Sequence, residues 1–173
     1  MPSMDFKSGT LKITGVKDFI SVMTSMGLNV GAASKEVITI AALHLEGKLK
    51  KRLSRSGTGK VYRTGSKGKR YKFHRASAPG EAPAVMFNRL RGSITHNVTG
   101  RAGSALPNPG GSKYNVKGQV GTNVSYGYFL ERGTRTMQPR PWFMLTVTQE
   151  MPRVLRIITD GLRDYIRANS KPR

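Results

Sequence analysis

Apolar residues recur three or four positions apart in two long segments of the chain, which is the spacing of one face of an α-helix. In residues 30–53 this stripe consists of Val37, Ile38, Ala41, Leu45, Leu49 and Leu53. After Pro141 a second stripe consists of Met151, Val154, Leu155, Ile158, Leu162, Tyr165 and Ile166. Pro152 either starts the second helix proper or kinks it, because proline lacks the N–H of the helical hydrogen bond. The pattern predicts two long amphipathic helices.

Shorter segments alternate apolar and polar residues, which is the period of a β-strand with one buried face. Residues 10–14 and 114–123 alternate in this way, and residues 90–98 begin another strand. Residues 101–111 are rich in glycine and proline and predict a long hairpin loop between the last two strands. We therefore expect a small, mainly antiparallel sheet.

Three short segments predict helical structure. Residues 16–26 have apolar residues near helical spacing, and Gly27 suits the C-cap. Residues 86–90 predict a short helical turn, and residues 126–132 predict one or two turns. Taken together, the elements predict an α+β fold in which a small, mainly antiparallel sheet packs against two long helices.

A loop-rich segment at residues 54–84 separates the first long helix from the sheet. Residues 48–75 carry twelve Lys or Arg residues and no acidic residue, interleaved with three aromatic residues. Glycines break any regular pattern, although residues 60–75 fit a hairpin with its turn at 65–68. Residues 76–84 combine Pro79, Gly80 and Pro83 and predict an extended linker that contains a turn. The segment is therefore predicted to be a long, basic, glycine-rich loop.

We expect a single domain over residues 10–168, because a chain of 173 residues can bury one core. Residues 1–9 predict a flexible N-terminal arm, and residues 169–173 a flexible tail. The N-terminus lacks the apolar stretch of a signal peptide, and the apolar cluster at 37–43 is far shorter than a membrane span. We therefore expect a protein that stays in the cytoplasm or assembles there, with no membrane partner.

The chain is strongly basic, with 30 Lys and Arg residues against 9 Asp and Glu residues, a net charge of +21. Such a surface attracts polyanions through the release of their counterions. Charge alone does not distinguish a nucleic acid from an acidic protein surface. The chain has no Cys, which excludes disulfides, thiolate nucleophiles and Cys-ligated metal sites.

Motifs for enzymatic chemistry are missing from the sequence. Residues 57–60 resemble part of a phosphate-binding loop, but Ser54 and Val61 stand where that loop needs Gly and Ser or Thr. The three histidines have no other ligand at metal-binding spacing, and the nine acidic residues form no obvious acid–base pair. We therefore expect a protein that is not an enzyme, holds no metal and needs no cofactor.

The segment 120–143 concentrates aromatic residues around one carboxylate, Glu131. Because Glu131 stands among arginines, an ion pair that fixes the turn is a simpler explanation than catalysis, and we expect Glu131 and Arg140 to hold this segment. Trp142 and Phe143 follow two prolines and fit core anchors ahead of the last helix. The functional alternative is a hydrophobic plug in a neighbouring subunit.

The basic run at 48–75 admits two interpretations. Lys and Arg residues interleaved with Tyr and Phe fit a surface that follows a nucleic-acid backbone. The alternative is a solvated loop that becomes ordered only against a partner. No helix-turn-helix, zinc or RNA-binding motif accompanies the run, so sequence-specific binding is not expected.

Several motifs occur in order along the chain. They are RSGTGKVYR at 55–63, ASAPGEAPA at 76–84, LRGSI at 90–94, VGTN and YGYFLERGT within 120–134, and RPWF at 140–143. Together, over residues 10–168, they resemble the tailed-phage family of small tail-completion or head–tail joining proteins, also described as minor tail components.

In that family an A-P-G-E-x-P loop precedes a strand, and a Tyr-rich turn with Glu-x-Gly-Thr precedes Arg-Pro-aromatic. The matching residues are Ala78, Pro79, Gly80, Glu81, Pro83, Tyr126, Tyr128, Glu131, Gly133, Thr134, Arg140 and Pro141. The chain departs from the family at Gly127, where Ala is usual, and in its basic, glycine-rich insert at 56–75.

The resemblance implies a structural protein of the virion neck or tail end, assembled in the host cytoplasm. Proteins of this family form rings, usually hexamers, between the portal-side connector and the tail tube or terminator, and packaged double-stranded DNA passes through them. Tail termination is an alternative role within this class, and a non-sequence-specific nucleic-acid-binding protein is the alternative outside it.

Two groups of contact residues are expected on this basis. Those expected to face the DNA channel or an acidic neighbouring ring are Lys51, Arg52, Lys60, Arg63, Lys67, Lys69 and Arg70. Those expected to make structural or subunit contacts are Tyr126, Tyr128, Glu131, Arg135, Arg140, Trp142 and Phe143.

Overall fold

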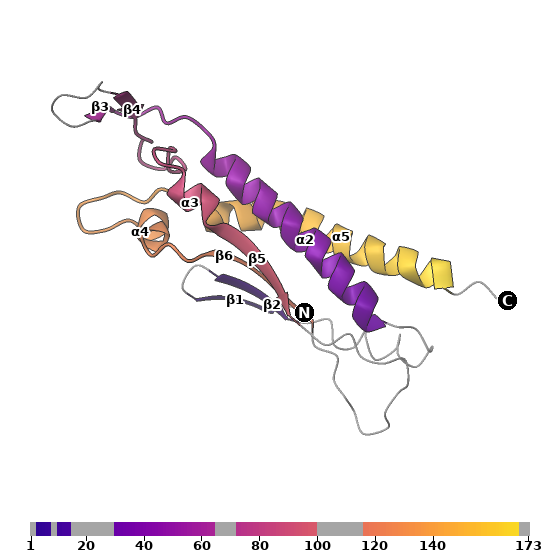
Figure 1. The fold of residues 1–173 in the computed structure, drawn as a ribbon. Helices are drawn as coiled ribbons and strands as arrows, with labels where there is room; N and C mark the ends of the chain where they lie inside the picture. Colours follow the sequence, from indigo (N-terminus) through magenta and orange to yellow (C-terminus); the bar gives the residue numbers. More distant parts are fainter. Residues whose placement is uncertain (1–2, 8–9, 15–29, 65–71, 100–115, 170–173) are drawn as a thin grey trace. The chain divides into compact units, whose positions relative to one another are not determined.

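The computed structural model describes residues 3–7, 10–14, 30–64, 72–99 and 116–169. Its helices and antiparallel strand pairs make the fold α+β, as the sequence predicts (Figure 1). The predicted helix at 16–26 lies outside the described residues, as do the predicted hairpin turn and the loop at 101–111.

The chain forms two compact units, where the sequence predicts one domain. Unit 1 consists of residues 1–45, 96–121 and 151–173, and unit 2 consists of residues 46–95 and 122–150. Both long helices contribute residues to both units. Each unit contains buried apolar side chains of its own.

Most of a four-stranded sheet belongs to unit 1. Its strands are β1 (Ser3–Lys7), β2 (Thr10–Thr14), β5 (Ile94–Thr99) and β6 (Lys117–Thr122), in the order β1-β2-β6-β5. The pairs β1–β2 and β2–β6 are antiparallel, with Leu11 opposite Val120 in the second pair. The predicted strand at 10–14 is thus confirmed, and the predicted strand at 114–123 forms over a shorter range.

Strand β1 differs from the flexible arm that the sequence predicts for residues 1–9. Residues 3–7 pair with β2 over their whole length, from Ser3 opposite Thr14 to Lys7 opposite Thr10. Antiparallel pairing satisfies backbone N–H and C=O groups that an isolated arm leaves to water. The polar composition of the segment concealed this capacity, because backbone pairing does not depend on apolar side chains.

The two long helices are α2 (Val30–Leu53) and α5 (Phe143–Asn169). In unit 1, glycines bring other elements close to α2. A methyl group added at Gly161 of α5 would lie 2.8 Å from Val37 Cγ2, and one added at Gly118 of β6 would lie 2.7 Å from Ile38 Cγ2. Pro152 lies inside α5 rather than at its start.

Unit 2 contains the last turns of α2, the first turns of α5 and four short elements. These are β3 (Val61–Thr64), β4 (Lys72–Arg75), α3 (Arg89–Gly92) and α4 (Tyr126–Arg132). The predicted hairpin of the basic segment and the predicted helix at 126–132 are both confirmed.

The predicted turn at 86–90 and the predicted strand start at residue 90 are wrong. Helix α3 begins at Arg89, because Asn88 adopts a left-handed conformation with φ of 59°, which a right-handed helix excludes. Strand β5 therefore begins only at Ile94.

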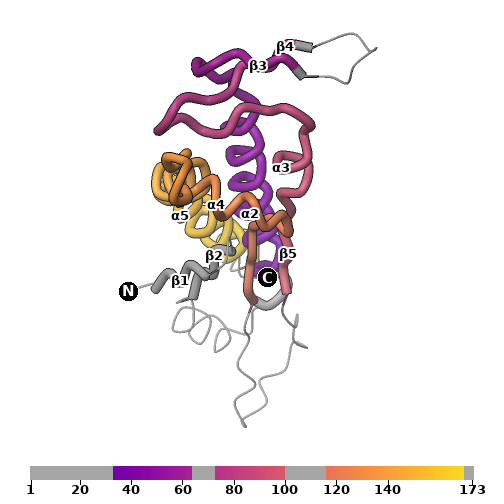
Figure 2. Tube along the Cα trace, turned by 90° about the vertical axis from the view of Figure 1, so that its left-hand side faces the viewer, coloured from indigo at the N-terminus to yellow at the C-terminus, as the bar shows by residue number. Residues whose placement is uncertain are grey.

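The core of unit 2 gathers side chains from α2, α3, β5 and α5. Its buried apolar residues are Leu49, Leu53, Leu90, Ile94, Trp142, Phe143 and Val147. Leu49 and Leu53 extend the predicted stripe of α2 into this unit. Figures 1 and 2 both draw β3 and β4 beyond the C-terminal end of α2.

Candidate functional site

Glu131 at the end of α4 caps the N-terminus of α5. Its Oε2 accepts hydrogen bonds from the backbone N–H groups of Trp142 and Phe143, both at 2.8 Å, and its Oε1 accepts one from Met144 at 3.0 Å. The first N–H groups of a helix have no partner within the helix, and the positive end of the helix dipole favours an anion. A carboxylate from the preceding helix, α4, therefore fixes where α5 begins.

Trp142 and Phe143 are the most deeply buried large side chains beside this cap, exposed by only 2% and 1%. Their rings meet edge to face, with centroids 5.4 Å apart. The Trp142 indole Nε1–H donates to the Gly127 carbonyl at 3.2 Å, so its polar group is satisfied inside the core. Trp142 and Phe143 are therefore core residues of this chain, as the core-anchor interpretation predicts.

The segment between α4 and α5 is closed by its own backbone. Arg140 N–H donates to Leu130 C=O at 2.8 Å, and Thr134 N–H donates to Met137 C=O at 2.8 Å. Gly133 makes the turn with φ of 79°, a conformation that favours glycine. We call residues 126–143 the aromatic corner.

The expected ion pair between Glu131 and Arg140 does not form within the chain. The Glu131 carboxylate is used by the α5 amides, and Arg140 Nη1 donates instead to Ser77 Oγ at 2.9 Å. The clamp interpretation therefore holds for Glu131 but with a different partner, because three backbone donors at a helix end compete with one guanidinium. A helix cap from outside the local sequence leaves no motif that sequence reasoning could use.

Glu81 is a second carboxylate that joins separate segments through hydrogen bonds, and its role was not predicted from the sequence. We call such a carboxylate a clasp. Its Oε1 accepts from Thr58 Oγ at 2.5 Å, and its Oε2 accepts from Thr58 N at 3.1 Å and Ala78 N at 2.9 Å. The hydrogen bond from the Thr58 hydroxyl, followed by those from the two amides, lowers the pKa of Glu81. The clasp ties residues 78–81 to the loop that leads into β3.

The basic segment contains an antiparallel ribbon, which we define as β3 and β4 together. Val61 lies opposite Arg75, Tyr62 opposite His74 and Arg63 opposite Phe73. Gly59 N–H to Ala76 C=O, at 2.8 Å, and Ala76 N–H to Lys60 C=O, at 2.9 Å, extend the pairing to its base. Directly opposite residues share a face, so Val61, Arg63, Phe73 and Arg75 project from one side.

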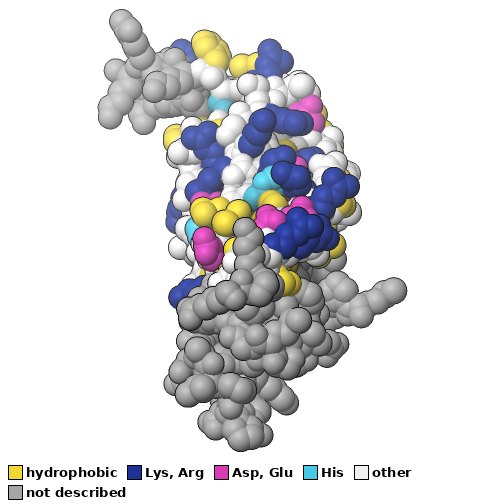
Figure 3. Space-filling view, turned by 90° about the vertical axis from the view of Figure 1, so that its right-hand side faces the viewer, with side chains coloured by type: hydrophobic (Ala, Val, Ile, Leu, Met, Phe, Trp, Pro, Cys, Tyr) yellow, Lys and Arg dark blue, Asp and Glu magenta, His cyan; other side chains and the backbone are white. Residues whose placement is uncertain are grey.

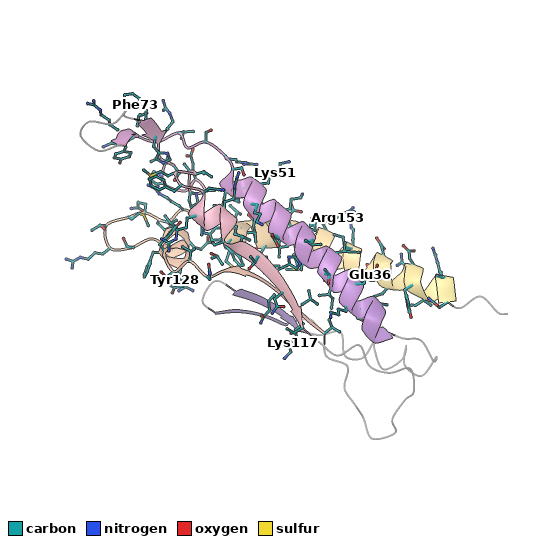
Figure 4. The ribbon with its side chains drawn as sticks, viewed as in Figure 1. Glu36, Lys51, Phe73, Lys117, Tyr128 and Arg153 are labelled. Carbon is teal, nitrogen blue, oxygen red and sulfur yellow. The ribbon has the colours of Figure 1, made fainter. Side chains whose placement is uncertain are left out.

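Large apolar side chains of the ribbon are exposed to solvent. Phe73 is 76% exposed and Tyr62 is 54% exposed (Figure 4). A two-stranded ribbon is only marginally stable in water by itself, so its closed base and the Glu81 clasp matter for its order. The combination of exposed aromatic rings and basic side chains suits contact with a partner.

The seven basic residues expected to face DNA or an acidic ring have different positions. Lys51, in the last turn of α2, is exposed (Figure 4). Lys60 and Arg63, at the ribbon, are also exposed. Arg52 is partly buried and donates to Gln149 Oε1 at 3.1 Å; burial and the neighbouring Arg55 lower its pKa, against the opposing effect of Glu131. The remaining three, Lys67, Lys69 and Arg70, lie outside the described residues.

The other expected contact residues line the surface of the aromatic corner. Tyr126 is 39% exposed and Tyr128 is 40% exposed. The Arg132 guanidinium lies 5.3 Å from the centroid of the Tyr128 ring, a cation–π distance. Arg135 is exposed. Tyr126, Tyr128 and Arg135 are therefore available at the surface, whereas Trp142 and Phe143 are not.

All four carboxylates of unit 2 are engaged within the chain. Glu46 pairs with Lys50, Glu150 pairs with Lys48 at 2.9 Å, and Glu81 and Glu131 form the two clasps. The same stretches of sequence, residues 46–95 and 122–150, contain seventeen Lys and Arg residues. Figure 3 shows Lys and Arg side chains spread over much of the described surface of one face. Unit 2 therefore carries a large excess of positive charge.

Among the described residues, no group of three or more His, Asp or Glu side chains is placed to hold a metal ion. Within the same part of the chain, every helix is too short or too polar to cross a membrane.

Comparison with known proteins finds no matching family model, no matching curated protein and no matching solved structure.

Proposed function

We propose that this chain is a structural protein of the neck or tail end of a tailed phage. It forms a ring that joins the tail to the head and lets double-stranded DNA pass. The ring is a hexamer, as is usual in the family that the sequence resembles. Its partners are further copies of itself, the head–tail connector and a tail-tube or terminator protein. It is assembled in the host cytoplasm and retained in the virion.

The observation that carries this proposal is the joining of the two segments on which the family resemblance rests. Gly80 N–H donates to Pro139 C=O at 3.0 Å, and Arg140 Nη1 donates to Ser77 Oγ at 2.9 Å. The A-P-G-E loop and the Arg-Pro-aromatic motif, far apart in sequence, thus form one hydrogen-bonded arrangement. The two segments that carry the resemblance are therefore in contact in this chain, which supports treating them as one pattern.

The surface of unit 2 also supports the proposal. A ring protein beside DNA needs basic groups to face phosphates and apolar groups to face neighbouring subunits. Lys51 and Lys60 are exposed basic residues, while Tyr128 and Phe129 are 40% and 51% exposed. Neighbouring exposed aromatic rings are typical of protein contact surfaces.

Electron microscopy of the purified full-length chain, combined with light scattering after size exclusion, tests the proposal. We expect closed rings, and we expect mass spectrometry to detect the chain in purified virions. A chain that remains monomeric at all concentrations and is missing from particles would overturn the proposal.

A non-sequence-specific nucleic-acid-binding protein is the second candidate, favoured by the exposed ribbon. Titration of duplex DNA at two salt concentrations separates the two functions. Saturable, strongly salt-dependent binding by the monomer supports this second candidate. Binding that requires the assembled ring supports the neck protein.

A further inference from the structure

Unit 2 has a groove that borders the aromatic corner and includes no residue of the ribbon. It has a volume of about 340 Å³ and lies between the end of α2, residues 83–91 and α4. Its apolar lining includes Leu53, Pro83, Leu90 and Leu130. Leu53 and Leu90 are buried core residues, so the floor of the groove is fixed by the packing of unit 2.

One wall of the groove is a run of three exposed apolar residues. Val85 is 37% exposed, Met86 45% and Phe87 80%. Water-exposed apolar side chains in one run are unfavourable for an isolated chain and mark contact surfaces. Phe87 is the most exposed large apolar residue among those described.

Hydrogen bonds fix the residues that directly follow this run. Directly after it, Asn88 takes a left-handed conformation with φ of 59°, and its Oδ1 accepts from Arg91 Nε at 2.6 Å. Arg91 Nη1 also donates to Ser54 Oγ, at 2.9 Å, which ties the run to the end of α2. The wall is therefore positioned before any partner arrives, which reduces the entropy cost of binding.

The charge of the groove is one-sided. Arg89 and Arg91 line it, and no Asp or Glu does. The four carboxylates of unit 2 are engaged elsewhere in the unit and leave this positive charge without local compensation. A second copy of the chain, with a net charge of +21, would add like charge at this surface.

We propose that the groove binds a segment of another protein that carries carboxylates on either side of a large apolar side chain. The apolar side chain enters the groove against Phe87 and Leu90, and the carboxylates meet Arg89 and Arg91. Burial of an apolar anchor supplies affinity, and the charges supply partner choice. The site is distinct from the ribbon, and the proposal does not depend on the phage function.

Fluorescence anisotropy with the full-length chain tests the site. The probe is a fluorescein-labelled synthetic peptide of glutamates around a Leu-Phe pair. Two matched peptides serve as controls, one with lysine for every glutamate and one with serine for Leu and Phe. We expect only the first to bind saturably.

Variants locate the binding. Phe87→Ser and Arg89→Glu should each weaken peptide binding by about tenfold, since each removes one of the two recognition elements. Their controls are Phe73→Ser, at a residue that is 76% exposed on the ribbon, and Arg75→Glu beside it. We expect both controls to bind the peptide as the unchanged chain does. Because these residues are exposed, none of the four changes should unfold the protein.

Each other outcome overturns the proposal. Equal loss in the groove and ribbon variants would assign the binding to overall charge. Displacement of the peptide by duplex DNA, with equal sensitivity to Phe87→Ser, would make the groove a nucleic-acid site. Loss of self-association in Phe87→Ser with no effect on the peptide would make it a contact between copies. Absence of peptide binding would also overturn it. The peptide-binding results do not bear on whether the chain forms a ring, which electron microscopy tests separately.

Discussion

The aromatic corner and the ribbon contain similar residues, but the corner buries its largest aromatic side chains and the ribbon exposes its own. Both combine aromatic rings with arginines, and each is held by one carboxylate, Glu131 within the corner and Glu81 beside the ribbon. The corner buries Trp142 to 2% exposure, whereas the ribbon leaves Phe73 76% exposed. Composition therefore does not decide which aromatic residues form a core; the elements on which they are placed do.

The two carboxylates show why the regions differ. Glu131 accepts from three consecutive backbone amides and positions a long helix whose first residues enter the core. Glu81 accepts hydrogen bonds from Thr58 and Ala78 at the base of the two-stranded ribbon. The large apolar side chains of the ribbon are exposed. The corner is therefore part of the core of unit 2, and the ribbon is a surface region whose aromatic side chains stay exposed.

Replacing the two aromatic residues in parallel gives the largest expected contrast. Trp142→Ala removes a buried ring and its hydrogen bond, and should lower the free energy of unfolding by about 3–5 kcal/mol. Phe73→Ala should change it by less than about 0.5 kcal/mol, because the ring is exposed. Urea denaturation followed by circular dichroism measures both. Similar losses at the two positions would show that the ribbon also packs into a core.

The cap on α5 gives the next largest effect. Glu131→Gln keeps the shape of the side chain but removes the negative charge at the helix N-terminus and leaves an NH₂ group facing a backbone donor. We expect a loss of about 1–3 kcal/mol in the free energy of unfolding.

Asp160→Asn is the matched control for the cap. Asp160 forms an exposed ion pair with Arg163 on α5, at 3.3 Å, and such pairs contribute little. We expect a change below about 0.5 kcal/mol for this control. If Glu131→Gln is as mild as Asp160→Asn, the carboxylate does not determine where α5 begins.

Local patterns in the sequence predicted the elements well where one periodic signal decides the structure. The helix at 30–53 and the helix at 126–132 both form over the predicted residues, and apolar spacing predicted the first of them. The exposed run at 85–87 misled the prediction, because its apolar residues look like a helical turn while Asn88 prevents one.

Contacts between distant segments were the part that local patterns could not predict. The isolation of Glu131 among arginines suggested a structural carboxylate. We expected Arg140 as its partner, because opposite charge was the pairing signal that the sequence offered. The donors are backbone N–H groups, and they lack a partner within the helix only because α5 begins at Phe143. Glu81 was recognised only as part of the family motif, and no role was predicted for it. Its partner Thr58 precedes the ribbon in sequence and Glu81 follows it, so no local pattern links the two residues.

The ribbon should be separable from the corner in its effect on DNA. Arg75→Glu reverses a charge on the ribbon and should weaken binding of duplex DNA several-fold and lower the salt dependence by about one to two phosphate contacts. Arg135→Glu, at an exposed position of the corner, is the matched control and should have the smaller effect. Titration at two salt concentrations measures both. Equal effects would show that net charge, rather than the ribbon, governs DNA binding.

The Glu81 clasp gives the smallest expected effect, because it lies at the solvent-accessible base of the ribbon. Hydrogen bonds from the Thr58 hydroxyl and from the Ala78 and Thr58 amides hold the pKa of Glu81 below its ordinary value of 4.5. A carboxyl whose pKa is lower in the folded state stabilises the fold fully above its unfolded pKa, and this contribution is lost as the pH falls through the folded pKa. The difference in unfolding free energy between the unchanged chain and Glu81→Gln should therefore be present near neutral pH and shrink well below pH 4.5. A difference that stays constant across this range would show that the charge of Glu81 has no part in holding the ribbon.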